Sequence, residues 1–222
     1  MLETIFSRLA PHYCLSCGEI GAQICDNCFY DIDLSPRQTC FLCHGILVAQ
    51  HCTTCPQLIG VQQCVFAERR DILARLLDDY KFGYKREAYK VIARIFDEYA
   101  PHLPAGTHIV PIPTSSLHIR RRGFDHTHDI TRELARRRGL TQSSLLARRH
   151  THSQVGASRA QRRVQAQTAY VVRKRAIDPD AYYALCDDVI TTGASMVAAL
   201  DKLRHAGASK LVVIALLQQP WQ

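Results

Sequence analysis

Four pairs of cysteines near the start of this 222-residue sequence constrain its fold more than any other feature. Each pair has the spacing C-x-x-C, and the stretches "CLSCGEIGAQICDNC" and "CFLCHGILVAQHCTTC" repeat one pattern of two pairs. A C-x-x-C turn presents two thiolates to the same side, so two such turns complete a tetrahedral zinc site. The predicted metal ligands are Cys14, Cys17, Cys25, Cys28, Cys40, Cys43, Cys52 and Cys55.

Two ways of pairing these turns are open. Sequential pairing makes two zinc ribbons and interleaved pairing makes a cross-brace, and the boundary of the repeat favours the sequential arrangement. Four cysteines leave no open position for water on zinc, and so short a segment buries little core. We therefore expect two structural zinc ions whose binding energy folds residues 1–60 as a double zinc ribbon.

Residues 61–222 have the pattern of an α/β domain. Apolar runs predict strands, and apolar residues at helical spacing predict helices between them. The predicted strands are 63–68, 107–113, 181–187 and 210–218, and the predicted helices are 70–83, 86–100 and 194–207. Residues 116–139 are expected to form a loop that leads into a helix ending at Gly139. This alternation predicts an open, Rossmann-like parallel sheet with flanking helices.

The sequence also indicates the cellular setting. No run of eighteen apolar residues is present, so we expect no membrane insertion. The first residues lack the basic and apolar regions of a secretory signal. Metal binding is therefore favoured over a disulfide framework for the cysteines, and a cytoplasmic location is expected.

The stretch "YALCDDVITTGAS" carries the chemistry. Two carboxylates, Asp187 and Asp188, end an apolar strand, and a short turn then opens a helix. Unpaired N–H groups and the helix dipole bind anions at such a turn. The predicted phosphate-binding residues are Thr191, Thr192, Gly193, Ala194 and Ser195. The carboxylates repel phosphate but suit sugar hydroxyls or hydrated magnesium, which together describe a ribose 5-phosphate. An ordinary strand–turn–helix corner is the alternative.

The formal net charge of +8 points to a polyanionic partner. Two four-thiolate zinc sites would lower it to about +4. Arginine runs follow residue 119, as in "IRRRG", "ARRH" and "VRKR", and they suit a phosphorylated small molecule or nucleic acid; solvated helix faces are the alternative. Phenylalanines and tyrosines do not cluster with these runs, so no aromatic platform for a single strand is predicted.

The stretch "YALCDDVITTGAS" resembles the phosphoribosyl-pyrophosphate signature of type I phosphoribosyltransferases. The resemblance implies that Asp187 and Asp188 contact the ribose hydroxyls and that residues 191–195 hold the 5-phosphate. It also implies magnesium bound together with phosphoribosyl pyrophosphate, and it assigns residues 61–222 to a type I phosphoribosyltransferase domain.

Cysteine pairs before such a domain, together with "VPIPTSSLHIRRRGFDH", resemble the ComF family, which includes GntX-type proteins. Asp125 and His126 replace the usual Asn-Gln of that motif. The later segment "SQVGASRAQRRVQAQTAY" resembles a second family motif, with Ala157 in place of the usual leucine. By resemblance, one side of the pyrophosphate is met by Pro113, Arg120 and Arg122. Arg162, with a catalytic role, and Arg163 would close over it from a flexible loop at 148–166.

The family resemblance implies a magnesium-dependent phosphoribosyltransferase acting in DNA uptake during natural transformation, with a base or amine acceptor that the sequence does not name. Single-stranded DNA, a helicase-like competence protein and a second copy in a homodimer are the implied partners. Two alternatives stay open. One is a competence protein that binds single-stranded nucleic acid, and the other is a sensor that binds phosphoribosyl pyrophosphate without chemistry.

Overall fold

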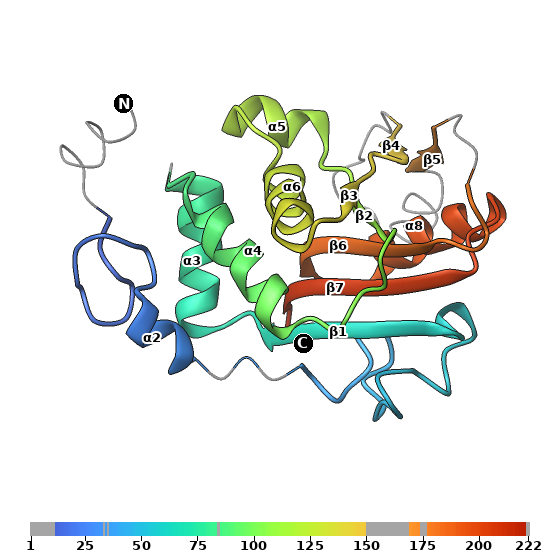
Figure 1. The fold of residues 1–222 in the computed structure, drawn as a ribbon, viewed down its shortest axis with the longest axis horizontal. Helices are drawn as coiled ribbons and strands as arrows, with labels where there is room; N and C mark the ends of the chain where they lie inside the picture. The colour runs from blue at the N-terminus through green and yellow to red at the C-terminus, as the bar shows by residue number, and fades with distance from the viewer. Residues whose placement is uncertain are drawn as a thin grey trace, which may run out of the picture.

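A parallel five-stranded sheet forms the centre of the computed structural model, which describes residues 12–32, 34, 36–83, 85–149, 169–173 and 177–220. The strand order is β1-β7-β6-β2-β3, and every neighbouring pair is parallel (Figure 1). The strands are β1 (Val61–Glu68), β2 (His108–Pro111), β3 (Thr141–Gln142), β6 (Tyr182–Ile190) and β7 (Lys210–Gln218). The predicted α/β class with an open parallel sheet is confirmed.

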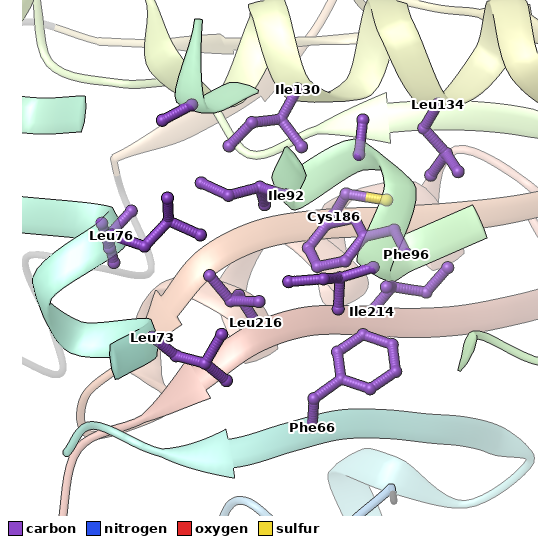
Figure 2. Close-up of a cluster of buried hydrophobic side chains, with 14 of the residues drawn as sticks. Phe66, Leu73, Leu76, Ile92, Phe96, Ile130, Leu134, Cys186, Ile214 and Leu216 are labelled. Atoms are coloured by element: carbon purple, nitrogen blue, oxygen red, sulfur yellow. The ribbon is translucent and has the colours of Figure 1, made fainter. Parts of the chain in front are cut away.

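Helices cover both faces of the sheet. The helices are α3 (Asp71–Phe82), α4 (Ala88–Tyr99), α6 (His126–Arg138) and α8 (Ala194–His205). The first three bury their apolar residues in one hydrophobic cluster with the sheet, and α8 buries its own in a second cluster. Figure 2 shows the first cluster, in which Cys186 lies among buried apolar side chains of the sheet and its covering helices, such as Ile214 and Phe96. Cys186 therefore belongs to the core and not to a metal site.

Three features of the fold differ from the sequence prediction. Residues 116–122, expected as a loop, form helix α5 (Ser116–Arg122), because the Ser115 hydroxyl accepts the N–H of His118 at its start. Strand β6 extends beyond both aspartates. An antiparallel pair outside the main sheet, β4 (Leu146–Arg148) and β5 (Tyr170–Val172), was not predicted, because each strand has only three residues. Helix α6 ends at Gly139, as predicted.

The cysteines group sequentially into two clusters, as the repeat favoured. Residues 14–30 form the first unit, which contains α2 (Asp26–Tyr30), and residues 40–55 form the second, which leads into η1 (Pro56–Leu58). Phe29 of the first unit joins the hydrophobic cluster of α3 and α4, whereas Phe41 of the second joins the cluster of α8. The two units therefore pack against opposite faces of the sheet (Figure 1). Among the described helices, none has the length and apolar character needed to cross a membrane.

Candidate functional site: a cleft at the switch point of the sheet

The chain leaves the sheet in opposite directions after β6 and after β2. Strand β6 leads through α8 to β7 on one side, and β2 leads through α5 and α6 to β3 on the other. Ligands of open α/β sheets bind in the crevice at such a switch point, beyond the carboxyl ends of the strands. A cleft of about 860 Å³ lies there, lined by residues that follow β2, residues that follow β6, and the β4–β5 pair.

The turn after β6 contributes one wall of this cleft. Thr192, Ala194 and Ser195 line it, and the Ala194 N–H donates to Thr192 Oγ1 at 3.4 Å. Thr191 is exposed beside them. Gly193 has a left-handed φ of +74°, and a Cβ built on it would lie 3.0 Å from Cδ2 of the Phe41 ring. Glycine is thus required by the backbone conformation and by the second cysteine unit behind the turn.

Three arginines form another wall of the same cleft. Arg148 and Arg149 stand at the end of β4 and Arg173 follows β5, and all three face the cleft. Within the parts of the chain that the structure describes, no carboxylate forms an ion pair with any of them. The sequence marked "ARRH" and "VRKR" as basic runs but did not select these arginines as site residues.

The surroundings of His118 indicate positive potential in this region. His118 also lines the cleft, and partial burial together with the charges of Arg122 and Arg148 lowers its pKa. A phosphate or pyrophosphate group would find few competing carboxylates here. Asp125 is the acidic residue in the lining, and its Oδ1 is already occupied by the hydroxyl of Thr114 at 2.9 Å.

The two neighbouring aspartates face opposite sides of the sheet. Strand residues alternate in direction, and Leu185 packs in the cluster of α8 whereas Cys186 packs in the cluster of α4. Asp187 lies on the same face of the sheet as Leu185 and is half-buried. Its Oδ1 accepts a hydrogen bond from the N–H of Asp188 at 2.9 Å. Asp188 lies on the same face of the sheet as Cys186 and is buried. Neither aspartate lines the cleft in this structure.

Asp188 is held by two cationic or hydrogen-bonding groups. Its Oδ2 lies 2.5 Å from Lys81 Nζ and 2.7 Å from His126 Nε2. Burial alone would raise the pKa of Asp188, but Lys81 and His126 outweigh it and hold that pKa well below its usual range. Burial and the charge of Asp188 raise the pKa of Asp187. The pair is therefore split into an ionised Asp188 and an Asp187 that retains its proton more readily.

Arg122 contributes to this network and not to the cleft wall. Its Nη1 lies 3.0 Å from His126 Nδ1, and a guanidinium can only donate, so Nδ1 accepts and Nε2 carries the proton given to Asp188. Among the other predicted pyrophosphate contacts, Pro113 lines the cleft, whereas Arg120 is exposed on α5 and outside the lining. Arg162 and Arg163 lie outside the described residues.

A second cleft of about 440 Å³ adjoins the first through their shared residue His118. It is lined by Lys81, Phe82, His118, Arg121, Arg122 and Phe124. The Arg122 guanidinium lies 5.0 Å from the centre of the Phe82 ring. The expectation that no aromatic residue clusters with the arginine runs was wrong, because Phe82 is distant from them in sequence and the fold brings it to α5.

Both cysteine clusters have the geometry of a four-thiolate zinc site. All four sulfurs of each cluster lie within 4.8 Å of one another. Metal–sulfur bonds of about 2.3 Å in a tetrahedron give sulfur–sulfur edges of about 3.8 Å. The Sγ atoms of Cys17 and Cys25 are 3.7 Å apart, as are those of Cys43 and Cys52.

Hydrogen bonds favour the thiolate form of some sulfurs in each cluster, whereas burial raises the pKa of others, such as Cys55. Burial opposes ionisation of Cys14, but hydrogen bonds from the surrounding backbone outweigh it and lower its pKa to about 6. Burial likewise opposes ionisation of Cys52, and hydrogen bonds from Thr54 and neighbouring backbone lower its pKa to about 6. Each cluster thus stabilises a thiolate, which is the form that binds zinc.

Comparisons with known proteins give distant structural similarities and no match in sequence. No family model matches the sequence, and no curated protein matches it. The structure is similar to one described as the allosteric regulatory enzyme of purine biosynthesis, with a TM-score of 0.39 and 18% identity over 57% of this chain and 24% of that chain. It is also similar to a hypoxanthine phosphoribosyltransferase from Staphylococcus aureus, with a TM-score of 0.36 and 12% identity over 60% of this chain and 64% of that chain. The chain thus spans less than two thirds of the length of either relative. At these TM-scores the similarity says nothing about function, which has to be inferred from the residues of the cleft.

Proposed function

We propose that this chain binds phosphoribosyl pyrophosphate with magnesium in the cleft at the switch point and transfers its phosphoribosyl group to a base or amine acceptor. The observation that carries the proposal is that Thr192, Ala194 and Ser195 of the turn line the same cleft as Arg148, Arg149 and Arg173. An anion-binding turn and three arginines without carboxylate partners in the described structure suit a ligand with phosphate groups at both ends.

The residues divide between the two ends of the ligand. The turn would bind the 5-phosphate through Thr191, Thr192, Gly193, Ala194 and Ser195. The arginine wall would bind the pyrophosphate, with Pro113 bounding the cleft after β2. Arg162 and Arg163, which follow β4 in the sequence, are proposed to add to the same wall. Arg120 is retained as a candidate from the family resemblance alone, and Arg122 would act through His126.

The aspartates would bind the ribose hydroxyls and the magnesium ion. Carboxylates accept hydrogen bonds from sugar hydroxyls and hold hydrated magnesium, which supplies positive charge against the leaving pyrophosphate when it is bound. Asp187 accepts a backbone N–H and forms no ion pair among the described residues, so it is the more available of the two. To bind the ligand, Asp188 would have to give up its ion pair with Lys81. Arginines that stabilise charge on the departing pyrophosphate would provide electrostatic catalysis.

Calorimetry with phosphoribosyl pyrophosphate and magnesium tests this proposal. Replacing Arg149 by Gln removes one charge-assisted contact and should weaken binding about 10- to 100-fold. Thr192→Val, which removes a hydroxyl from the turn, should weaken it by less. Arg136→Gln is the matched control, because Arg136 is exposed on α6 and pairs with Glu133. No binding by zinc-loaded wild type, or equal losses in Arg149→Gln and Arg136→Gln, would contradict the proposal.

The proposed transfer and a binding-only sensor differ in one product. The transferase releases pyrophosphate once a base or amine acceptor is added, whereas the sensor binds the same ligand and releases none. A coupled pyrophosphate assay over a panel of nucleobases and amines separates the two. Release that disappears in Arg149→Gln would support transfer at this cleft.

A second candidate function, binding of single-stranded nucleic acid, is favoured by the second cleft. The Phe82 side chain is 63% exposed beside Arg121 and Arg122, and bases stack on such aromatic rings next to cations. The ComF resemblance extends this candidate to DNA uptake with a helicase-like partner, and the reduced cysteines suit a cytoplasmic protein. Phe82→Ala should weaken binding of a single-stranded oligonucleotide about 5- to 150-fold, and Tyr13→Ala, which removes another exposed aromatic residue, should not.

The metal content and the assembly state complete the proposal. We propose one structural zinc ion in each cysteine cluster, and metal analysis of purified protein should give two zinc ions per chain. The resemblance also suggests a homodimer, which light scattering would detect as twice the mass of the 25.1 kDa chain.

A further inference from the structure

The second cysteine unit packs directly behind the turn that we assign to phosphate binding. Its first C-x-x-C segment, Cys40–Cys43, carries Phe41 at the tip, and the Phe41 side chain is 1% exposed. A Cβ on Gly193 would lie 3.0 Å from Cδ2 and 3.1 Å from Cε2 of that ring, and 3.3 Å from Leu42 Cδ1. The backbone of the turn at Gly193 therefore lies against Phe41 and Leu42.

The backbone N–H and the backbone carbonyl of Phe41 are both hydrogen-bonded to side chains of the sheet. Its N–H donates to Gln63 Oε1 of β1 at 3.2 Å, and its carbonyl accepts from Gln218 Nε2 of β7 at 3.0 Å. Both glutamines are 1% exposed. Gln63 Nε2 and Gln218 Oε1 have no hydrogen-bond partner in the described structure, so the bond to Phe41 is what satisfies each buried amide.

The end of β7 joins this anchor to the start of the turn. The N–H of Gln219, next to Gln218, donates to the carbonyl of Ile190 at 2.8 Å. Ile190 is the last residue of β6 and immediately precedes Thr191. The turn is therefore held at its entry by β7 and at Gly193 by Phe41, and the second of these contacts depends on where the second cysteine unit sits.

The position of Phe41 depends in turn on the metal site. Cys40 and Cys43 flank the tip, and the N–H of Leu42 donates to Cys40 Sγ at 3.4 Å. Small four-cysteine units fold with their metal and lose their fold without it. The first unit differs, because its equivalent residue Leu15 packs against the cluster of α3 and α4, on the other side of the sheet.

We infer that Phe41 is a positioning residue for the phosphate-binding turn, and that metal binding at the second cysteine site is thereby linked to phosphoribosyl binding. The inference rests on the proposed function for the identity of the ligand but not for the contact itself. Linkage is reciprocal, so the ligand should hold the metal at this site as much as the metal favours the ligand. The first cysteine site should show no such linkage.

Hydrogen exchange tests the positioning without any ligand. The variants are Phe41→Ala and Leu15→Ala, each checked to contain two zinc ions. Phe41→Ala should speed exchange of the amides in residues 191–197 about tenfold or more, within the usual range of couplings between sites, and Leu15→Ala should leave it unchanged. Phe41→Leu, which retains an apolar side chain, should give an intermediate rate and replaces Phe41→Ala if that variant does not fold. Unchanged exchange in folded, zinc-loaded Phe41→Ala and Phe41→Leu would overturn the inference.

Zinc release tests the linkage. Release to a zinc-selective chelator should have two phases in wild type, and saturating phosphoribosyl pyrophosphate with magnesium should slow one of them. The slowing should persist in Leu15→Ala and be lost or reduced in Phe41→Leu at ligand concentrations that saturate each protein. Equal slowing in both variants would overturn the linkage. Failure of wild type to bind the ligand would instead refute the proposed function, and the exchange comparison would still decide whether Phe41 positions the turn.

Discussion

The contact between Gly193 and Phe41 gives the sharpest prediction on stability. Gly193→Ala adds one methyl group to a residue with φ of +74°. The left-handed conformation costs an L-residue about 1–2 kcal/mol. The new methyl group would also overlap the Phe41 ring, which cannot move aside because it is buried and its backbone is anchored; overpacking of this kind costs about 1–3 kcal/mol. We expect a total loss of about 2–5 kcal/mol in the free energy of unfolding.

Gly139→Ala is the matched control for the backbone term. Gly139 has φ of +63° and nothing within 4 Å of a built Cβ, so its loss should be limited to about 1–2 kcal/mol. Urea unfolding followed by far-ultraviolet circular dichroism, in zinc-loaded protein, measures both variants. A double-mutant cycle with Phe41→Ala isolates the steric term, because Gly193→Ala should cost about 1–3 kcal/mol less when the ring is absent. The reasoning fails if Gly193→Ala costs the same with and without the Phe41 ring, or no more than Gly139→Ala.

Three further predictions concern buried groups. Burial raises the pKa of Cys64 to about 12 and that of Cys186 further, so iodoacetamide at pH 8 should leave both unmodified in native protein and label them after unfolding, as read by mass spectrometry. Lys81→Met leaves the Asp188 carboxylate buried without its cation and should cost about 3–5 kcal/mol in urea unfolding, whereas Lys85→Met, which breaks a partly exposed pair, should cost less than about 1 kcal/mol. Because the pKa of Asp188 is depressed by folding, its contribution to stability is complete above the unfolded value of about 3.9 and is lost as the pH falls below it. Wild type should therefore lose more stability between pH 5 and pH 3 than Asp188→Asn does, and equal losses would exclude a depressed pKa.

Local patterns in the sequence were sufficient for most of the fold. The apolar run at 210–218 coincides with β7, and the helix predicted at 194–207 corresponds to α8. The repeat of the cysteine pairs predicted the grouping of the two clusters. These features depend on neighbours in the chain, for which periodicity and spacing are adequate guides.

The features that the sequence did not predict depend on contacts between distant segments. Sequence order places Asp187 and Asp188 together, but only the pleat of β6 and the position of Lys81 on α3 show that they face different surroundings. The contact between Gly193 and Phe41 could not be predicted for the same reason, because Phe41 lies about 150 residues earlier in the chain. Arg149 and Arg173 became site candidates only once β4 and β5 were seen to pair beside the cleft.

The place of β7 in the sheet has a consequence for how the nascent chain folds. β7 is synthesised after the other described strands, yet it lies between β1 and β6, and Val61 pairs with Leu211 (Figure 1). Emerging from the ribosome, the cysteine units can bind metal early, but β1 has no partner strand until β7 appears. The apolar side chains of β1 and of helices α3 and α4 therefore lack the β7 part of their core until β7 has been synthesised, and a chaperone that shields them would raise the yield of folded protein.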